Sequence, residues 1–163
     1  MGSRRDRSAG TPATTELTRR GVAFGVHPYE HDPAAASYGL EAAAALSVPP
    51  GQVFKTLLVE ADRGLAVGIV PVDRSLDLKA LAAALGLKKV SMADPAAAER
   101  STGYVVGGIS PIGQRKRLPT VLDLGASAFD VVYVSGGRRG LDLSLSPTDL
   151  VAATGAVMAA IAC

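Results

Sequence analysis

Residues 53–72, VFKTLLVEADRGLAVGIVPV, predict a β-hairpin and so indicate a fold built on paired strands. Residues 53–59 are rich in β-branched and aromatic side chains, which favour extended backbone, and residues 65–72 are again apolar. The segment ADRG at residues 61–64 is polar and ends in glycine, as tight connections between neighbouring strands often do. We therefore expect two adjacent antiparallel strands here.

Short helices and further strands are expected on both sides of this hairpin. Capping residues predict helices that begin at Thr11-Pro12, Ser37, Asp77, Asp94-Pro95 and Ser146-Pro147, with ends at Gly21, before Pro49, at Gly86, at residue 99 or 100 and near Gly155. Strands are expected over residues 22–27, 88–92, 104–106, 119–122, 131–134 and 141–145, the last half-buried because its leucines alternate with Asp142 and Ser144. This order predicts an α+β fold, with a mixed, largely antiparallel sheet curled towards a barrel and flanked by short helices, rather than a doubly wound fold.

The composition is that of one folded domain without disulfides. The chain has 163 residues, of which 48% are apolar and 20% charged, so it is long enough to bury a core. A net charge of +2 gives no global indication of nucleic acid binding, and 4% aromatic residues with no Trp argue against a base-stacking platform. The single cysteine, Cys163, excludes a disulfide framework and fits a reducing cytoplasm.

No targeting or membrane-spanning segment is evident in the sequence. Residues 1–10, MGSRRDRSAG, lack the apolar core of a signal peptide, and we expect them to form a disordered tail ahead of one domain over residues 11–163. No segment reaches the roughly 18 to 20 apolar residues that a transmembrane helix needs. We expect a cytoplasmic protein that does not enter a membrane.

A second informative stretch is residues 101–117, STGYVVGGISPIGQRKR, which joins a glycine pair to a basic run. Gly107 and Gly108 permit positive φ angles or the close approach of a partner. Arg115, Lys116 and Arg117 place cationic donors beside them. The stretch fits a ligand held close to the backbone. It fits equally a tight connection followed by a solvated basic face.

Two catalytic glycine motifs do not fit this stretch. Residues 108–113, GISPIG, have the glycine spacing of a P-loop, but Gln114 and Arg115 stand where Lys and Ser or Thr are needed. The same residues do not form the G-x-S-x-G elbow of serine hydrolases. Nucleoside triphosphate binding and a serine nucleophile are therefore not expected.

A metal site near the first strand is also not expected. Four side chains there could be ligands, namely those of His27, Glu30, His31 and Asp32. The two histidines would share a face only in a helix, and Pro28 and Pro33 oppose a helix in this segment.

Lys55 is the most informative single residue. Its strand is apolar on both faces, with Val53 and Leu57 on the side of Lys55 and with Phe54 and Leu58 on the other. A buried ammonium group needs an acidic partner, a phosphate or a cluster of carbonyls. Alternatively, the lysine reaches water from an edge strand.

Residues 135–140, SGGRRG, predict a second glycine-rich turn, with the basic pair Arg138 and Arg139. Two such turns, the strand lysine and the basic residues suit a phosphate-bearing ligand such as an RNA end. No residue class indicates an obvious protein nucleophile.

Four segments resemble the YbaK/EbsC family of Cys-tRNA(Pro) deacylases in sequence and in spacing. They are residues 27–32, HPYEHD; 53–58, VFKTLL; 101–117; and 133–142, YVSGGRRGLD. The resemblance runs from about residue 11 to the C-terminal helix. It implies a stand-alone relative of the bacterial prolyl-tRNA synthetase editing domain, with a β-barrel-like sheet flanked by helices. Such a protein would clear Cys-tRNA(Pro) alone or Cys-tRNA(Cys) as well, without cofactor or metal.

The resemblance also implies a site. Lys55 would be the essential residue of a pocket lined by Tyr29, Tyr38, Phe54, Thr56, Gly107, Gly108, Ile109, Ser110, Ser135, Gly136 and Asp142. The basic residues expected to meet the tRNA backbone are Arg115, Lys116, Arg117, Arg138 and Arg139. In the mechanism proposed for the family, the substrate thiol attacks its own ester and leaves a cysteine thiolactone, so no protein nucleophile is needed.

The expected substrate is the 3′ aminoacyl end of a mischarged tRNA, and the expected partner is prolyl-tRNA synthetase. Two alternatives use the same scaffold. One is a deacylase of another mischarged tRNA, such as Ala-tRNA(Pro), whose substrate has no thiol. The other is a non-catalytic module that binds tRNA or a synthetase.

Overall fold

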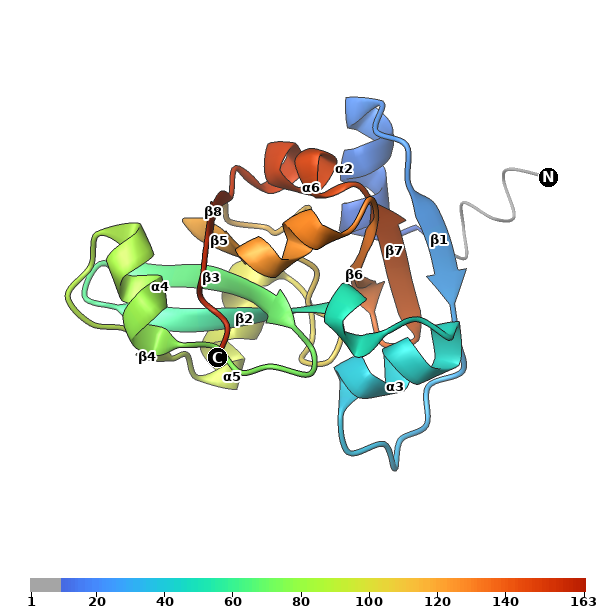
Figure 1. Ribbon diagram of the computed structural model, residues 1–163, viewed down its shortest axis with the longest axis horizontal. Coiled ribbons are helices and arrows are strands. Elements are labelled where there is room, and N and C mark those ends of the chain that lie inside the picture. The colour runs from blue at the N-terminus through green and yellow to red at the C-terminus, as the bar shows by residue number, and fades with distance from the viewer. Residues whose placement is uncertain (1–9) are drawn as a thin grey trace.

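A computed structural model describes residues 10–163, and the tail expected over residues 1–10 lies outside them except for Gly10. Two β-sheets lie side by side and short helices surround them (Figure 1). One sheet has five strands in the order β4-β2-β3-β5-β8, and the other has three in the order β1-β7-β6. The α+β class with mixed, largely antiparallel sheets and short flanking helices is confirmed.

The five-stranded sheet is built on the expected hairpin. β2 (Phe54–Ala61) and β3 (Gly64–Pro71) pair antiparallel in unbroken register over their whole length. β4 (Ser91–Met92) covers only Val59 and Glu60 on the other side of β2. β5 (Thr120–Asp123) lies parallel to β3, and β8 (Val157–Ala159) lies parallel to β5. The strand expected over residues 88–92 is thus shorter, and β8 was not expected because three residues are too few for an alternating pattern.

The three-stranded sheet is antiparallel throughout. β7 (Leu141–Leu145) lies between β1 (Gly25–Pro28) and β6 (Val132–Arg138), and a single parallel bridge between Val53 and Tyr133 connects the two sheets. The register of β6 shifts between Ser135 and Arg138. The prediction of a glycine-rich turn over residues 135–140 is therefore wrong for residues 135–138, which extend β6 as a β-bulge.

The helices begin where the sequence predicts. They are α2 (Pro12–Arg20), α3 (Tyr38–Leu46), α4 (Leu78–Leu85), α5 (Pro95–Thr102) and α6 (Pro147–Thr154), and each follows a side chain that accepts a first-turn N–H: Thr11, Ser37, Asp77, Asp94 and Ser146. These caps satisfy N–H groups that have no partner inside the helix, which explains the match. Two short 3₁₀ turns, Pro50–Gln52 and Leu124–Ala128, complete the regular structure. No helix within residues 10–163 is long and apolar enough to cross a membrane.

β2 is covered on both faces along most of its length. Phe54 and Leu58 belong to the main core, which also contains residues of α2, α6 and the three-stranded sheet. Val59 lies on the opposite face, in a second core with Leu81 and Ala82 of α4. This double coverage explains why the strand is apolar on both faces.

The strand expected over residues 104–106 is absent. Gly103 ends α5 with a left-handed φ of 81°, and the chain then turns. The Tyr104 hydroxyl donates to the Ile112 carbonyl at 2.6 Å, and Val106 N–H donates to Glu99 Oε2 at 2.9 Å. Side-chain hydrogen bonds therefore hold this apolar segment, which makes no ladder with a neighbouring strand. Residues 104–117, named the wall loop below, form one irregular connection between α5 and β5.

Candidate active site

A cavity of about 390 Å³ opens beside β2, between α3 and the wall loop. The side chains that line it come from segments far apart in the sequence, and most are apolar. Its lining residues with polar side chains are Tyr29, Ser37, Tyr38, Lys55, Thr56, Ser135 and Asp142. None of the lining residues is a cysteine or a histidine.

One wall of the cavity is an open stretch of strand edge. On this side of β2, β4 begins only at Val59, and β6 reaches only the bridge at Val53. The Leu58 carbonyl accepts Ala93 N–H on this side, whereas the Val53 carbonyl faces β3 and accepts Val72 N–H. Because backbone groups alternate in direction along a strand, the N–H and C=O of Thr56 face the cavity side. Among the described residues no strand pairs with them there, so they are free to bind a ligand.

The Thr56 side chain is also available. Its Oγ1 is buried and has no hydrogen-bond partner within residues 10–163. A buried hydroxyl without a partner is unfavourable, and a ligand that supplied one would relieve the deficit. Thr56 therefore contributes two backbone polar groups to the wall, and its buried hydroxyl without a partner lies in the same residue.

Lys55 lines the cavity and is half-buried. Within residues 10–163 it forms no ion pair with an acidic side chain. The expectation of a lysine enclosed on both faces is therefore wrong. The alternative of an edge strand is not met as stated either, because β2 lies between β4 and β3 and lacks a neighbour only where β4 does not extend as far as Lys55. A cationic group without a protein partner at the rim of an apolar cavity is suited to an anionic ligand.

Asp142 is the most deeply buried charged residue of the cavity, with 5% of its surface exposed. It lies in β7 opposite His27 of β1 and Ser135 of β6, so the three residues form a row across the sheet. Burial raises the pKa of the Asp142 carboxyl to about 7. The half-buried strand expected over residues 141–145 is thus buried on the side of Asp142 too, because the cavity wall covers that side.

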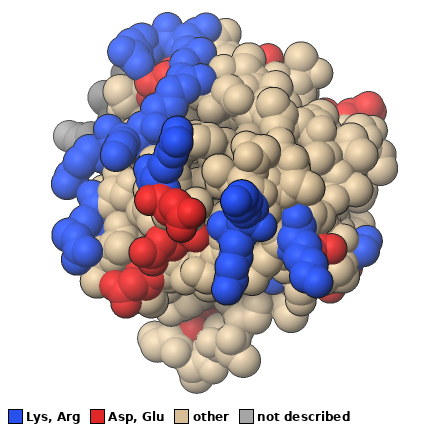
Figure 2. Space-filling model, turned by 90° about the vertical axis from the view of Figure 1, so that its left-hand side faces the viewer, with Lys and Arg blue, Asp and Glu red and all other residues tan. Residues whose placement is uncertain are grey.

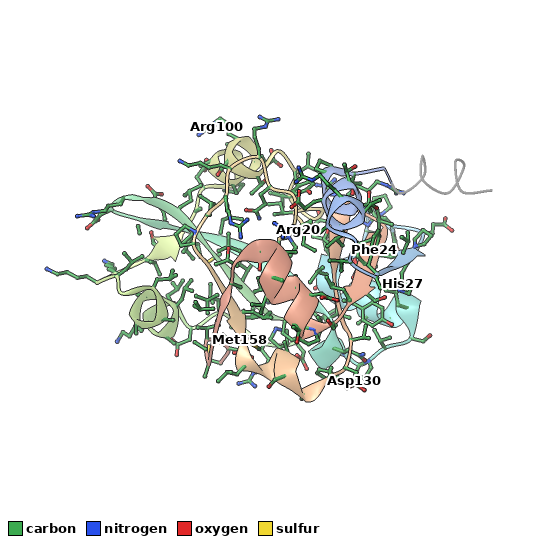
Figure 3. The ribbon with its side chains drawn as sticks, turned by 90° about the horizontal axis from the view of Figure 1, so that it is seen from above. Arg20, Phe24, His27, Arg100, Asp130 and Met158 are labelled. Carbon is green, nitrogen blue, oxygen red and sulfur yellow. The ribbon has the colours of Figure 1, made fainter. Side chains whose placement is uncertain are left out.

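Two tyrosines line the same cavity as this carboxyl group. Burial, with the charges of Asp142 and Glu41, raises the pKa of Tyr29 to about 12, so its phenol stays a neutral donor. Tyr38 stands at the mouth of the cavity with 39% of its surface exposed. His27 does not line the cavity; its Nε2 lies 2.8 Å from Ser144 Oγ, at the β1 side of the sheet (Figure 3).

The wall loop is fastened to the β6–β7 connection by Arg139. Its Nε and Nη2 both donate to the Val106 carbonyl, at 2.9 and 2.7 Å, and its guanidinium carbon lies 5.3 Å from the centre of the Tyr38 ring. A Cβ at Gly107, whose φ is 89°, would lie 2.8 Å from Arg139 Nε and from Tyr38 Cζ. Gly107 is therefore required for this close approach of Arg139 and Tyr38.

Three of the expected pocket residues lie behind the cavity wall. Gly108 packs against the backbone of Arg138, and its N–H donates to the Val105 carbonyl. Ser110 is fully buried, and its Oγ accepts Ile112 N–H. Neither residue lines the cavity, and neither does Gly136.

The structure thus brings most of the expected pocket residues together. Those that line the cavity are Tyr29, Tyr38, Phe54, Lys55, Thr56, Gly107, Ile109, Ser135 and Asp142. Residues of β4, of α5 and of the link between them that were not expected line it as well: Met92, Ala93, Pro95 and Ala98. They are apolar and small or flexible, and no sequence pattern distinguishes them from core residues. Within residues 10–163 no group of three or more His, Cys, Asp or Glu side chains could hold a metal.

A model of the aminoacyl-tRNA editing domain family matches residues 32–153. An Enterococcus faecalis protein named "Putative Cys-tRNA(Pro)/Cys-tRNA(Cys) deacylase EbsC" is 40% identical over 113 residues, 69% of this chain and 69% of that protein. The proline–tRNA ligase of Moorella thermoacetica is 34% identical over 95 residues, 58% of this chain but 16% of the ligase.

A solved structure described as a "putative trans-editing enzyme for prolyl tRNA synthetase" has a TM-score of 0.83 and 27% identity, over 94% of this chain and 96% of that one. The matches agree with the resemblance found in the four sequence segments, which is confirmed. From its sequence and its fold, the chain belongs to the aminoacyl-tRNA editing domain family.

Proposed function

We propose that residues 11–163 act as one editing domain, a trans-editing deacylase that removes cysteine from Cys-tRNA(Pro), and also from Cys-tRNA(Cys). One observation carries the proposal. In a member of the aminoacyl-tRNA editing family, an apolar cavity joins an unpaired lysine, a buried carboxyl group and an open strand edge. The similarity to the Enterococcus faecalis protein supports the same substrate class.

The chemistry of the lining residues favours a reaction in which the substrate supplies the nucleophile. No cysteine lines the cavity, and no histidine stands there to activate a hydroxyl group. In the substrate-assisted reaction the cysteinyl sulfur bonds to its own ester carbonyl carbon. The bond from that carbon to the 3′ oxygen of the tRNA breaks, and the oxygen takes up the proton that the thiol loses. The products are free tRNA and a cysteine thiolactone.

The protein's contribution to this reaction is orientation and charge stabilisation. We assign the Thr56 N–H at the open edge to the developing oxyanion, because a preorganised donor there acts in water-poor surroundings. Asp142 would hold the ammonium group of the aminoacyl moiety, since an adjacent cation favours its ionised form. Lys55 would contact the terminal adenosine or its phosphate. Folding the substrate on itself would supply proximity.

The body of the tRNA would contact basic residues outside the cavity. Arg115, Lys116 and Arg117 are exposed and remain our candidates for the RNA backbone, together with Arg138. Arg139 was proposed for the same role, but its Nε and Nη2 are engaged by Val106, so less of its guanidinium is available to RNA. We propose that the protein acts in the cytoplasm, where a prolyl-tRNA synthetase supplies part of the tRNA selectivity.

The deciding experiment is deacylation of Cys-tRNA(Pro), Cys-tRNA(Cys), Ala-tRNA(Pro) and a Ser-tRNA by the wild type and by Lys55→Ala. We expect deacylation of the cysteinyl substrates with release of free tRNA and cysteine thiolactone, and loss of activity in the Lys55 variant. Lys79→Ala is the matched control, because Lys79 is exposed on α4, away from the cavity. Full activity of Lys55→Ala would refute the role of this residue.

Other outcomes select the alternatives. Preference for the alanyl substrate would replace the thiol-assisted reaction with a different one. Binding of tRNA without any deacylation would indicate a non-catalytic module. Addition of prolyl-tRNA synthetase should raise the rate or give a ternary complex, and the absence of both effects would count against a synthetase partner.

A further inference from the structure

A second hollow, of about 270 Å³, lies between α2, the C-terminal half of the wall loop and the end of α6. In contrast to the cavity it is lined mainly by polar groups. Its lining residues are Glu16, Arg19, Arg20, Pro111, Gly113, Gln114, Arg117, Leu118, Thr120, Ala153 and Thr154. Three guanidinium groups thus face one carboxylate, and the hollow carries excess positive charge.

The carboxylate leaves this excess in place. Glu16 pairs with Arg20 at 2.5 Å and with Arg19. These two hydrogen bonds, the one from Arg20 above all, lower the pKa of Glu16, so it is ionised at neutral pH. It neutralises one guanidinium charge, and it orients both side chains. The Arg19 side chain is still 73% exposed and the Arg20 side chain 34% exposed, so both can reach a ligand.

Arg117 is held on the opposite side of the hollow by the end of α6. A Cβ at Gly155, which ends this helix with a φ of 72°, would lie 2.6 Å from Arg117 Nη2. The guanidinium therefore lies directly over the helix terminus, where the partial negative charge of the helix dipole favours a cation. Glycine at position 155 leaves room for this placement.

The wall loop itself is docked on α2. A Cβ at Gly113 would lie 2.6 Å from the carbonyl oxygen of Pro12, so the two backbones are in contact. Gln114 Nε2 donates to the Ser110 carbonyl at 3.0 Å and ties the two halves of the loop together. The cations of the hollow are therefore mounted on helices and on a docked loop.

Further cations extend this region towards α5. Arg115 N–H and Lys116 N–H donate to the carbonyls of Thr102 and Ser101, which places both residues beside the end of α5 and near Arg100. Figure 2 shows Lys and Arg side chains gathered in a band along one side of the molecule. Figure 3 shows Arg20 and Arg100 on α2 and α5, the two helices that flank the wall loop.

We propose that this hollow binds phosphodiester groups of the RNA strand whose aminoacylated end occupies the cavity. Ile109 lines the cavity and Pro111 lines the hollow, so the two sites lie two residues apart on the wall loop, at most about 7 Å of extended chain. At about 3.4 Å per nucleotide along a stacked strand, that is the length of roughly two nucleotides. One end of the wall loop thus contacts the aminoacyl ester, and the other end contacts the RNA backbone just upstream of that ester. The identity of the strand rests on the proposed function.

The test uses an RNA hairpin with a single-stranded 3′ end that carries no amino acid. Its binding is measured by fluorescence anisotropy over a range of salt concentrations. A lost phosphate contact lowers the slope of log K against log salt by about 0.7 for a single strand. We expect this decrease for Arg117→Gln and for Arg20→Gln, and about twice the decrease for the double variant. Arg117→Lys keeps the charge and should keep the slope.

Arg63→Gln is the matched control, because Arg63 is exposed in the β2–β3 turn and lines neither hollow. Circular dichroism and melting curves identify any variant that fails to fold, and Arg20→Gln and Arg117→Gln alter different elements. Unchanged slopes in folded Arg117→Gln and Arg20→Gln would overturn the proposal. So would an equal decrease for Arg63→Gln, or loss of synthetase association with unaltered RNA binding.

The assay separates this inference from the proposed function. If the slopes fall as expected but no aminoacyl-tRNA is deacylated, the hollow binds RNA and the deacylase proposal fails. If deacylation is found and the slopes do not change, the deacylase proposal stands and the hollow has no such role.

Discussion

Replacement of Asp142 by Asn should make the protein more stable above neutral pH. Burial raises the pKa of the Asp142 carboxyl from its ordinary value of 3.8 to about 7. Each pKa unit corresponds to about 1.4 kcal/mol, so the ionised carboxylate lowers the free energy of unfolding by about 4 kcal/mol. Asparagine has nearly the same shape as aspartate and cannot ionise, so the variant keeps the stability that the wild type loses when Asp142 ionises.

The sign follows from proton binding. Between about pH 4 and pH 7 the folded state keeps a proton on Asp142 that the unfolded state has lost, so stability falls as the pH rises. Below pH 4 Asp142 is protonated in both states, so the protein has its full stability. Above pH 7 the carboxyl group is ionised in both states, and the stability that came from its protonated form is lost. We therefore expect Asp142→Asn to match the wild type near pH 4 and to exceed it by about 4 kcal/mol at pH 8.

Urea unfolding followed by circular dichroism, at half-unit steps from pH 4 to pH 8, measures this difference. Burial lowers the pKa of His27, which lies opposite Asp142, and its titration makes stability rise with pH. Because His27 is present in both proteins, its contribution cancels in the difference between variant and wild type. Two parallel stability curves would refute the burial argument. So would an Asp142→Asn variant less stable than the wild type at pH 8.

Two further substitutions test the wall loop. Arg139→Lys keeps the charge but cannot reproduce the double hydrogen bond to Val106, and charged hydrogen bonds contribute about 1.5–3 kcal/mol each. We expect kcat for deacylation to fall about tenfold or more, with KM for tRNA and the salt dependence of binding nearly unchanged. A role of Arg139 in RNA binding would instead raise KM. Gly108→Ala would put a Cβ 2.7 Å from the backbone Cα of Arg138 and should lower the free energy of unfolding in urea by about 1–3 kcal/mol. Gly51→Ala is the control, because a Cβ there would have no atom within 4 Å, and it should change the stability little. Equal effects of the two substitutions would contradict the packing argument.

The helices were predictable because their starts depend on neighbours in the chain. Thr11, Ser37 and Asp77 each accept an N–H from a residue three positions later, so the sequence contains both partners. The hairpin of β2 and β3 was predictable for the same reason, because its turn and its two apolar segments are adjacent. Local interactions leave a pattern that a short window of sequence reveals.

Predictions were wrong where contacts outside a segment decide its structure. Residues 104–106 have the composition of a strand, but hydrogen bonds with Glu99 and Ile112 hold the segment, and within residues 10–163 it pairs with no strand. Residues 135–138 have the composition of a turn, but pairing with β7 draws them into a bulged strand. In both cases contacts with residues just outside the segment outweighed the propensity of the segment itself.

The sequence by itself determined the helix starts, the hairpin and, through four spaced motifs, the membership of the editing family. Tertiary structure alone decided the burial of Asp142, the open edge at Thr56 and the engagement of Arg139 by Val106. Each of these depends on groups from separate parts of the chain that meet only in the folded protein. A carboxyl pKa near 7 is likewise a property of the surroundings, since the same aspartate in water would ionise near pH 4.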